Sequence, residues 1–216
     1  MPLSSISAGK ASVLLREVVA APGHASVAVG FGLALAVQTI SAASASRAAT
    51  LLWVREAAAV VETGDAYGPG LAAFGLSPSG CIIIEARTSV DALRAALEGA
   101  RCAALGAVVL EMRAPIDLTA SRRLKLAAEK SGVAIVLVRL GGHGEPNAAQ
   151  LRWRVQAAPQ ASDRMRRTAF EMIVLKSPSG LDGRRSIVEW DHDRKCFTQA
   201  LSVPMDAVPG IGSLAA

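Results

Sequence analysis

The sequence is short of aromatic residues, of cysteine and, over a long stretch, of lysine. Aromatic residues make up 4% of the 216 residues and apolar residues 51%, so a sizeable core has to be built from aliphatic side chains. Cys81, Cys102 and Cys196 lie far apart without the spacing of a zinc site, and no metal is expected. The apolar surroundings of Cys81 and Cys102 predict buried thiols, which fits a reducing cytoplasm.

No lysine occurs between Lys10 and Lys125. That stretch includes Pro22–Gln38, PGHASVAVGFGLALAVQ, which follows a predicted strand and passes through glycines into an apolar helix. A nucleotide-binding fold places its phosphate loop at this point, with the pattern GxxxxGK[ST]. The missing lysine therefore raises the question of whether the fold is kept and the chemistry lost.

The charge pattern is mildly basic. The formal net charge is +5 and arginine far outnumbers lysine, which permits an acidic partner or nucleic acid without requiring one. The N-terminus has no apolar signal-peptide core. Residues 25–46 carry no charge and are long enough to span a bilayer, but their glycines, serines and Gln38 favour a buried core helix, so no membrane association is expected.

Apolar strands alternate with helices up to about Gly141. Such strands are buried on both faces, which is typical of a mostly parallel sheet with helices on both sides. Shorter strands without room for helices follow, as in an antiparallel extension. The predicted strands cover residues 13–20, 49–56, 81–86, 104–112, 133–140, 151–158, 167–176 and 184–190. The predicted helices are 26–43, a short helix within 67–80 that ends in a turn, 88–103 and 119–131. Thr88 or Ser89 and Thr119 are the expected N-caps, and Gly132 the expected end, of the last two helices.

Four short motifs sharpen this pattern: YGPGLAAFGL, DLTASRRLKLAAEKSGVA, LRWRV and VEWD. Together they resemble the ImuA family, bacterial SOS mutagenesis proteins of the RecA/SulA superfamily, from about Leu14 to Asp191. The resemblance implies an α/β fold with a RecA-like, mostly parallel twisted sheet, helices on both faces and a C-terminal antiparallel extension. The expected organisation is an N-terminal segment at 1–12, a RecA-like core without a Walker A motif at 13–195, and a flexible tail at 196–216. ImuA-type proteins usually carry an extra segment before the first strand, so part of it is missing here or the start is assigned late.

The resemblance also says where an ATPase would keep its catalytic groups. Gly32 falls near the lysine position and Leu33 near the Ser/Thr position, with Gly30 as a loop or close-packing glycine. Glu111 falls near the magnesium carboxylate and Glu56 near the catalytic glutamate. Without the lysine these carboxylates are interpreted as vestigial, no residue is predicted to be catalytic, and no cofactor is expected.

DNA binding of the recombinase type is not indicated. The two loops that grip single-stranded DNA in RecA are cut down here to RAPID (113–117) and GGHGEPNAAQ (141–150). Basic side chains elsewhere form a solvated surface or contact a partner or DNA. These candidate contacts are Arg122, Arg123, Arg152, Arg154, Arg164, Arg166 and Arg167. Alternation in LRWRV places Trp153 in the core, and WDHDRKC (190–196) is better explained as a turn than as a metal site.

Three functions remain open at this level. The first is a non-catalytic, cytoplasmic accessory protein of SOS mutagenesis and translesion synthesis. The resemblance implies as its partners an ImuB-like relative of the Y-family polymerases, an error-prone replicative-type polymerase and RecA. The alternatives are a SulA-like inhibitor of cell division that binds FtsZ, and a degenerate RecA-like ATPase.

Overall fold

The computed structural model describes residues 13–43, 49–141, 145–159 and 167–199. Its centre is a nine-stranded sheet in the order β3-β2-β4-β5-β1-β6-β7-β8-β9. The strands are β1 (Leu15–Ala20), β2 (Leu51–Glu56), β3 (Cys81–Ala86), β4 (Ala107–Met112), β5 (Ala134–Arg139), β6 (Leu151–Ala157), β7 (Arg167–Lys176), β8 (Arg185–Asp191) and β9 (Cys196–Gln199). The helices are α2 (Ala25–Ala42), α3 (Ala57–Thr63), α4 (Gly68–Ala73), α5 (Ser89–Arg101) and α6 (Leu118–Ser131), with a short 3-10 turn, η1 (Pro78–Gly80).

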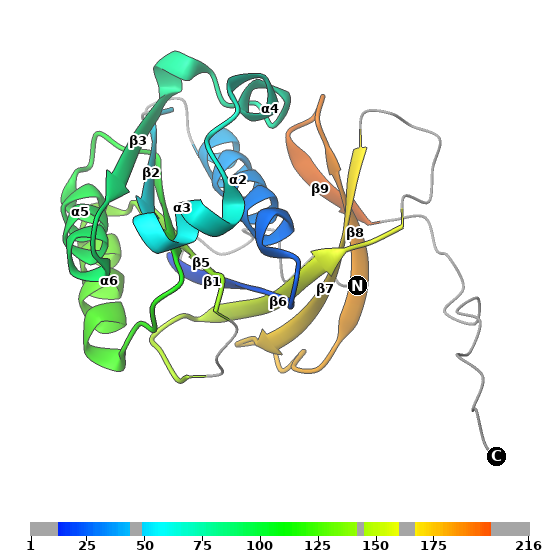
Figure 1. The fold of residues 1–216 in the computed structure, drawn as a ribbon. Coiled ribbons are helices and arrows are strands. Elements are labelled where there is room, and N and C mark those ends of the chain that lie inside the picture. Colours follow the sequence, from blue (N-terminus) through cyan, green and yellow to red (C-terminus); the bar gives the residue numbers. More distant parts are fainter. Residues whose placement is uncertain (1–12, 44–48, 142–144, 160–166, 200–216) are drawn as a thin grey trace.

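The sheet has a parallel and an antiparallel part, as the sequence predicted. Strands β3, β2, β4, β5, β1 and β6 pair in parallel, and β6 to β9 pair antiparallel. The strand β6 therefore belongs to both parts, whereas the sequence placed it wholly in the extension. The helices lie on both faces: α2, α3 and α4 contribute to one apolar cluster, and α5 and α6 to the other (Figure 1).

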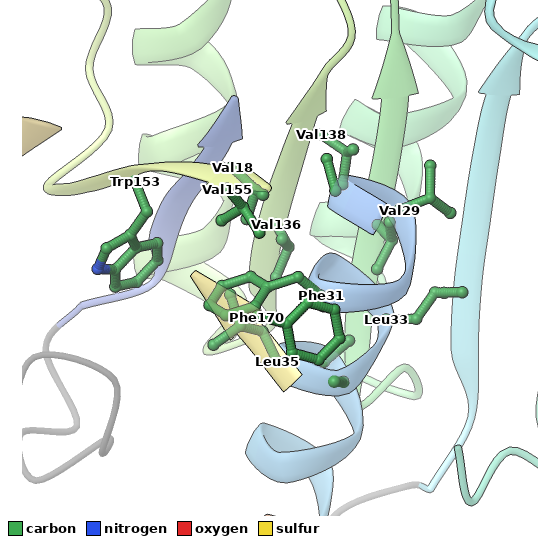
Figure 2. Close-up of a cluster of buried hydrophobic side chains, with 14 of the residues drawn as sticks. Val18, Val29, Phe31, Leu33, Leu35, Val136, Val138, Trp153, Val155 and Phe170 are labelled. Atoms are coloured by element: carbon green, nitrogen blue, oxygen red, sulfur yellow. The ribbon is translucent and has the colours of Figure 1, made fainter. Parts of the chain in front are cut away.

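The helix α2 is the central core helix. Its residue Phe31 contacts aromatic rings from three of the antiparallel strands. Figure 2 shows Phe31 with Trp153 of β6 and Phe170 of β7. The ring centroid of Phe31 lies 6.2 Å from that of Trp153, 5.3 Å from that of Phe170 and 4.7 Å from that of Phe197. By length and composition α2 could span a membrane. It packs inside the protein instead, because a helix that is apolar on all sides is stable when other elements enclose it. Trp153 is fully buried, as predicted.

The helix ends follow ordinary capping chemistry. The Thr88 hydroxyl accepts a hydrogen bond from the Asp91 backbone N–H at 3.1 Å, which confirms Thr88 as the N-cap of α5. For α6 the expectation of Thr119 was wrong: the Asp117 carboxylate accepts from the Ala120 N–H at 2.6 Å. The N-cap lies two residues before Thr119, and the helix begins at Leu118, because this carboxylate reaches a free N–H group of the first turn. Gly132 ends α6 in the left-handed conformation, with φ 78°, as expected.

The strand β3 differs from its prediction. Its apolar run predicted burial on both faces, but Ile82, Ile83 and Ile84 are 49%, 39% and 37% exposed. The reason is its place at the edge of the sheet, where only β2 pairs with it. The cysteine prediction fails in the same region, since Cys102 is exposed and Cys81 only half-buried.

Two elements were not predicted. The helix α3 follows β2 directly, and its alanine-rich sequence has no preceding turn signal. The strand β9 lies inside the segment 196–216 that was expected to be a flexible tail, so the ordered core extends at least to Gln199. Antiparallel pairing with β8 holds this strand in place. A four-residue pattern of apolar and polar side chains is too short to predict that pairing. Residues 1–12 and 200–216 lie outside the described part of the chain.

Candidate functional site

The connection between β1 and α2 is the place where a phosphate loop would lie. It consists of residues 21–24 only, because β1 ends at Ala20 and α2 begins at Ala25. The Ala21 N–H donates to the Val155 carbonyl at 2.9 Å, and the His24 N–H donates to the Ala21 carbonyl at 2.9 Å. A tight turn of this kind leaves no loop that could wrap around a triphosphate.

The glycines assigned to that loop lie inside α2 instead. Gly30, Gly32 and Leu33 belong to its second and third turns, and Leu33 is buried (Figure 2). A Cβ on Gly32 would lie 2.5 Å from Val138 Cγ2 on β5, so Gly32 allows the helix to approach the sheet. Close packing therefore explains Gly32, whereas a Cβ on Gly30 would make only an ordinary contact with Phe74 at 3.5 Å.

Glu111 is the last but one residue of β4, is fully buried, and has its hydrogen-bond partners within the protein. Its Oε2 accepts from Arg55 Nε at 2.9 Å and from Trp53 Nε1 at 3.0 Å, and its Oε1 contacts the Thr63 hydroxyl. Arg55 is 1% exposed and also donates to the Gly64 carbonyl at 2.6 Å. The position near which a magnesium carboxylate was predicted is thus taken by an internal ion pair.

Arg55 was missed by the sequence reasoning, although a signal existed. It interrupts the apolar strand LLWVRE, and a charge buried in a central strand needs a partner. The neighbouring Glu56 is not that partner. Its Oε2 accepts from the backbone N–H groups of Arg113 at 2.8 Å and Ala114 at 3.0 Å, so it fixes the loop after β4.

The space left above these side chains is small. A hollow of about 170 Å³ lies between the start of α2, the end of β2 and the segment of α3 and α4. Tyr67 and Phe74 of that segment help to line it, with Ser26 and Arg55. A second hollow of about 450 Å³ borders it and shares Ser26, Gly30 and Phe74 with it, and neither lining contains a lysine that could bind a triphosphate.

The arginines named as candidate contacts fall into separate groups. Arg152 pairs with the buried Glu17, and Arg167 lies 3.0 Å from Glu189 and 3.2 Å from Asp191, so both are held within the sheet. Arg154 is exposed on β6. Arg164 and Arg166 lie outside the described residues. Arg122 and Arg123 are exposed on α6, far from the antiparallel strands in the fold (Figure 1).

The segment WDHDRKC forms a turn, as the sequence favoured. The Asp191 carboxylate accepts from the backbone N–H groups of Asp193 at 3.1 Å and Arg194 at 2.9 Å. His192 Nδ1 lies 2.7 Å from the Ala73 carbonyl. Within the described ranges, no three His, Cys, Asp or Glu side chains gather as metal ligands would.

The fold and the tight turn at 21–24 define an α/β protein with a mostly parallel sheet, an antiparallel extension and no phosphate loop between β1 and α2. The chain is similar to Protein ImuA of Caulobacter vibrioides, in strains NA1000/CB15N and CB 15, at 33% identity over 136 residues. The match covers 58% of this chain and 53% of the relative, so the chain spans about half the length of the curated relatives it matches. No family model matches the chain. The resemblance to ImuA that the motifs indicated is confirmed.

Proposed function

We propose that this chain is a non-catalytic, RecA-like accessory protein of damage-induced mutagenesis and translesion synthesis. It acts in the cytoplasm by binding other proteins and needs no bound nucleotide. The observation that carries the proposal is the buried contact of Arg55 with Glu111, which uses the acidic end of β4 as part of the core. The similarity to ImuA supports the biological setting.

The partners follow from the same resemblance. An ImuB-like relative of the Y-family polymerases is the first, and an error-prone replicative-type polymerase and RecA are the others. The short connections at 113–117 and 21–24 support a role in protein contact over one in gripping DNA or hydrolysing ATP.

The test combines a binding and a genetic measurement. The full chain should co-purify with the ImuB-like protein of the same genome, and a deletion strain should lose damage-induced mutagenesis, which the wild-type gene restores. Absence of association together with normal mutagenesis in the deletion strain overturns the proposal. Filamentous cells on overexpression, with mutagenesis unaffected, would instead indicate a SulA-like inhibitor of FtsZ.

A further inference from the structure

The helices α5 and α6 lie side by side on the face of the sheet opposite α2 (Figure 1). A groove runs between them. Two hollows of about 600 and 260 Å³ form it, and both are lined by Leu97 and Arg123, so they are continuous. Near the C-terminal ends of the two helices, the Ser131 hydroxyl donates to the Ala100 carbonyl at 2.6 Å. From Val90 to Arg101 the groove extends about 16 Å, at about 1.5 Å of rise per helical residue.

The lining of the groove combines an apolar floor with cations. The side chains that line it include Arg94, Arg101, Arg123 and Lys130 and no aspartate or glutamate. Arg94 and Arg101 form exposed pairs with Asp91 and Glu98 of the same helix, at 3.6 and 2.7 Å. Such exposed pairs contribute little and can be exchanged for other partners. Among the described residues, no ion pair involves Arg123 or Lys130.

Apolar side chains stand exposed along the same groove. Leu126 is 64% exposed and Val90 53%, although each lines one of the two hollows. Single exposed apolar residues are common, but here they lie beside a hollow whose floor, Leu93, Leu97 and Leu124, is also apolar. Covering them with another apolar surface would be favourable.

We propose that the α5–α6 groove binds an acidic amphipathic helix of a partner protein. A helix of about three turns matches its length and would place its apolar stripe on Leu97 and Leu126. Carboxylates beside that stripe would reach Arg123 and Lys130. The identification of the partner as a mutagenesis protein rests on the proposed function, whereas the groove and its ligand chemistry do not.

Other occupants fit the groove less well. Single-stranded nucleic acid is held by aromatic side chains that stack on bases, and the lining contains none. A second copy docked by a two-fold axis would set the same cationic rim against itself, which is repulsive. An acidic amphipathic helix complements both the positive charge and the apolar floor of the groove.

The probe is a capped, fluorescent peptide of about 16 residues with leucines every third or fourth position and glutamates between them. Anisotropy is measured with the full chain, against a peptide of the same composition in scrambled order and one with lysine for each glutamate. We expect binding of the first peptide alone. Arg123→Glu should raise its Kd by about tenfold, because an attraction becomes a repulsion, and Leu126→Ser should raise it severalfold.

Matched controls change an exposed arginine and an exposed aliphatic residue that lie outside the groove. Arg122→Glu changes the neighbouring exposed arginine of α6, which does not line the groove, and Val61→Ser changes a 90% exposed residue on α3. Both should leave Kd within about twofold. Circular dichroism and thermal unfolding verify that each variant is folded.

Four results overturn the proposal. They are equal binding of the scrambled peptide, no effect of Arg123→Glu, displacement of the peptide by oligo-dT, and a dimer in sedimentation that Leu126→Ser abolishes. Intact peptide binding with normal mutagenesis in the deletion strain would reject the proposed function and leave the groove assignment standing. If the deletion strain loses mutagenesis and the Arg123→Glu gene restores it as fully as the wild-type gene, the proposed function stands and the groove is rejected as the site that binds the partner.

Discussion

At the scale of single residues, Arg55 and Glu111 decide what the carboxyl edge of the sheet can do. Both are almost fully buried, and each satisfies the other's charge. A carboxylate that accepts hydrogen bonds from Arg55 and Trp53 and contacts the Thr63 hydroxyl has little capacity left for magnesium-bound water. Glu111, which the sequence placed near a magnesium carboxylate, is thus part of a structural contact.

Breaking this pair should be costly. Arg55→Leu leaves the buried Glu111 without its cation, and we expect the free energy of unfolding to fall by about 3–5 kcal/mol in urea titrations. The double variant Arg55→Leu/Glu111→Leu should recover a large part of that loss. Arg94→Leu, which breaks an exposed pair, is the control and should cost less than about 1 kcal/mol. A loss below that level for Arg55→Leu would show that the pair is not structural.

Asp191 provides a pH test of the turn between β8 and β9. The backbone N–H of Arg194, and then the Arg167 guanidinium, hold the pKa of its carboxyl below the usual value. Its contribution to stability is therefore complete above the unfolded pKa of about 3.9 and is lost as the pH falls toward the lower folded pKa. Asp191→Asn should be less stable than wild type at pH 7, with a gap that narrows below about pH 4.

Urea unfolding at pH 7 and at about pH 3 measures that gap, with the exposed Asp65→Asn as the control. A gap of equal size at both pH values would mean that the charge of Asp191 does not stabilise the turn.

At the scale of elements, α2 shows how position within one helix separates two glycines. A Cβ at position 32 meets Val138 Cγ2 at 2.5 Å, whereas one at position 30 meets Phe74 Cζ at 3.5 Å, an ordinary contact. Gly32→Ala should destabilise the protein by about 1–3 kcal/mol through overpacking. Gly30→Ala should be neutral or stabilising by up to about 1 kcal/mol, because alanine favours the helix. Thermal and urea unfolding of both variants measure this, and equal effects would contradict the close-packing role.

Elements also show which predictions a sequence can support. The existence of α5, α6 and the central strands followed from periodicity, and these elements agree closely with the structure, although the N-cap of α6 is Asp117 and not Thr119. The exposure of β3 could not be predicted in this way, since an apolar run looks the same at the centre and at the edge of a sheet. Strand order decides that exposure, and strand order depends on contacts between residues far apart in the chain.

At the scale of the whole molecule, nucleotide binding is the decisive question. The four-residue turn at 21–24, the helical Gly30 and Gly32, and the buried Arg55–Glu111 ion pair together predict that Mg·ATP does not bind. At about 1 mM Mg·ATP we expect Tm to change by less than about 1 °C, since a ligand stabilises only the state it binds. A P-loop ATPase assayed alongside should show a clear increase. A rise of several degrees for this chain would mean that α3 and α4 move to admit the nucleotide.

Some features of the candidate site could be predicted from the sequence and others required the structure. Loss of the phosphate-loop lysine and the ImuA-like motifs were evident in the sequence, because they depend on which residues are present. The groove around Arg123 was not, because its walls come from two helices separated by β4. The sequence singled out Arg123 as one of several arginines, without distinguishing it from Arg152 and Arg167, which ion pairs hold in the sheet.

What the sequence determined by itself is the class of fold, the placement of its central helices and strands, and the absence of a phosphate-loop lysine. These depend on local periodicity, capping and residue identity. Tertiary structure alone decided that Arg55 neutralises Glu111, that β3 is an edge strand, and that Arg123 lies beside an apolar groove. Each of these results from the packing of segments distant in sequence, where burial and partner charges are set by neighbours that no local pattern identifies.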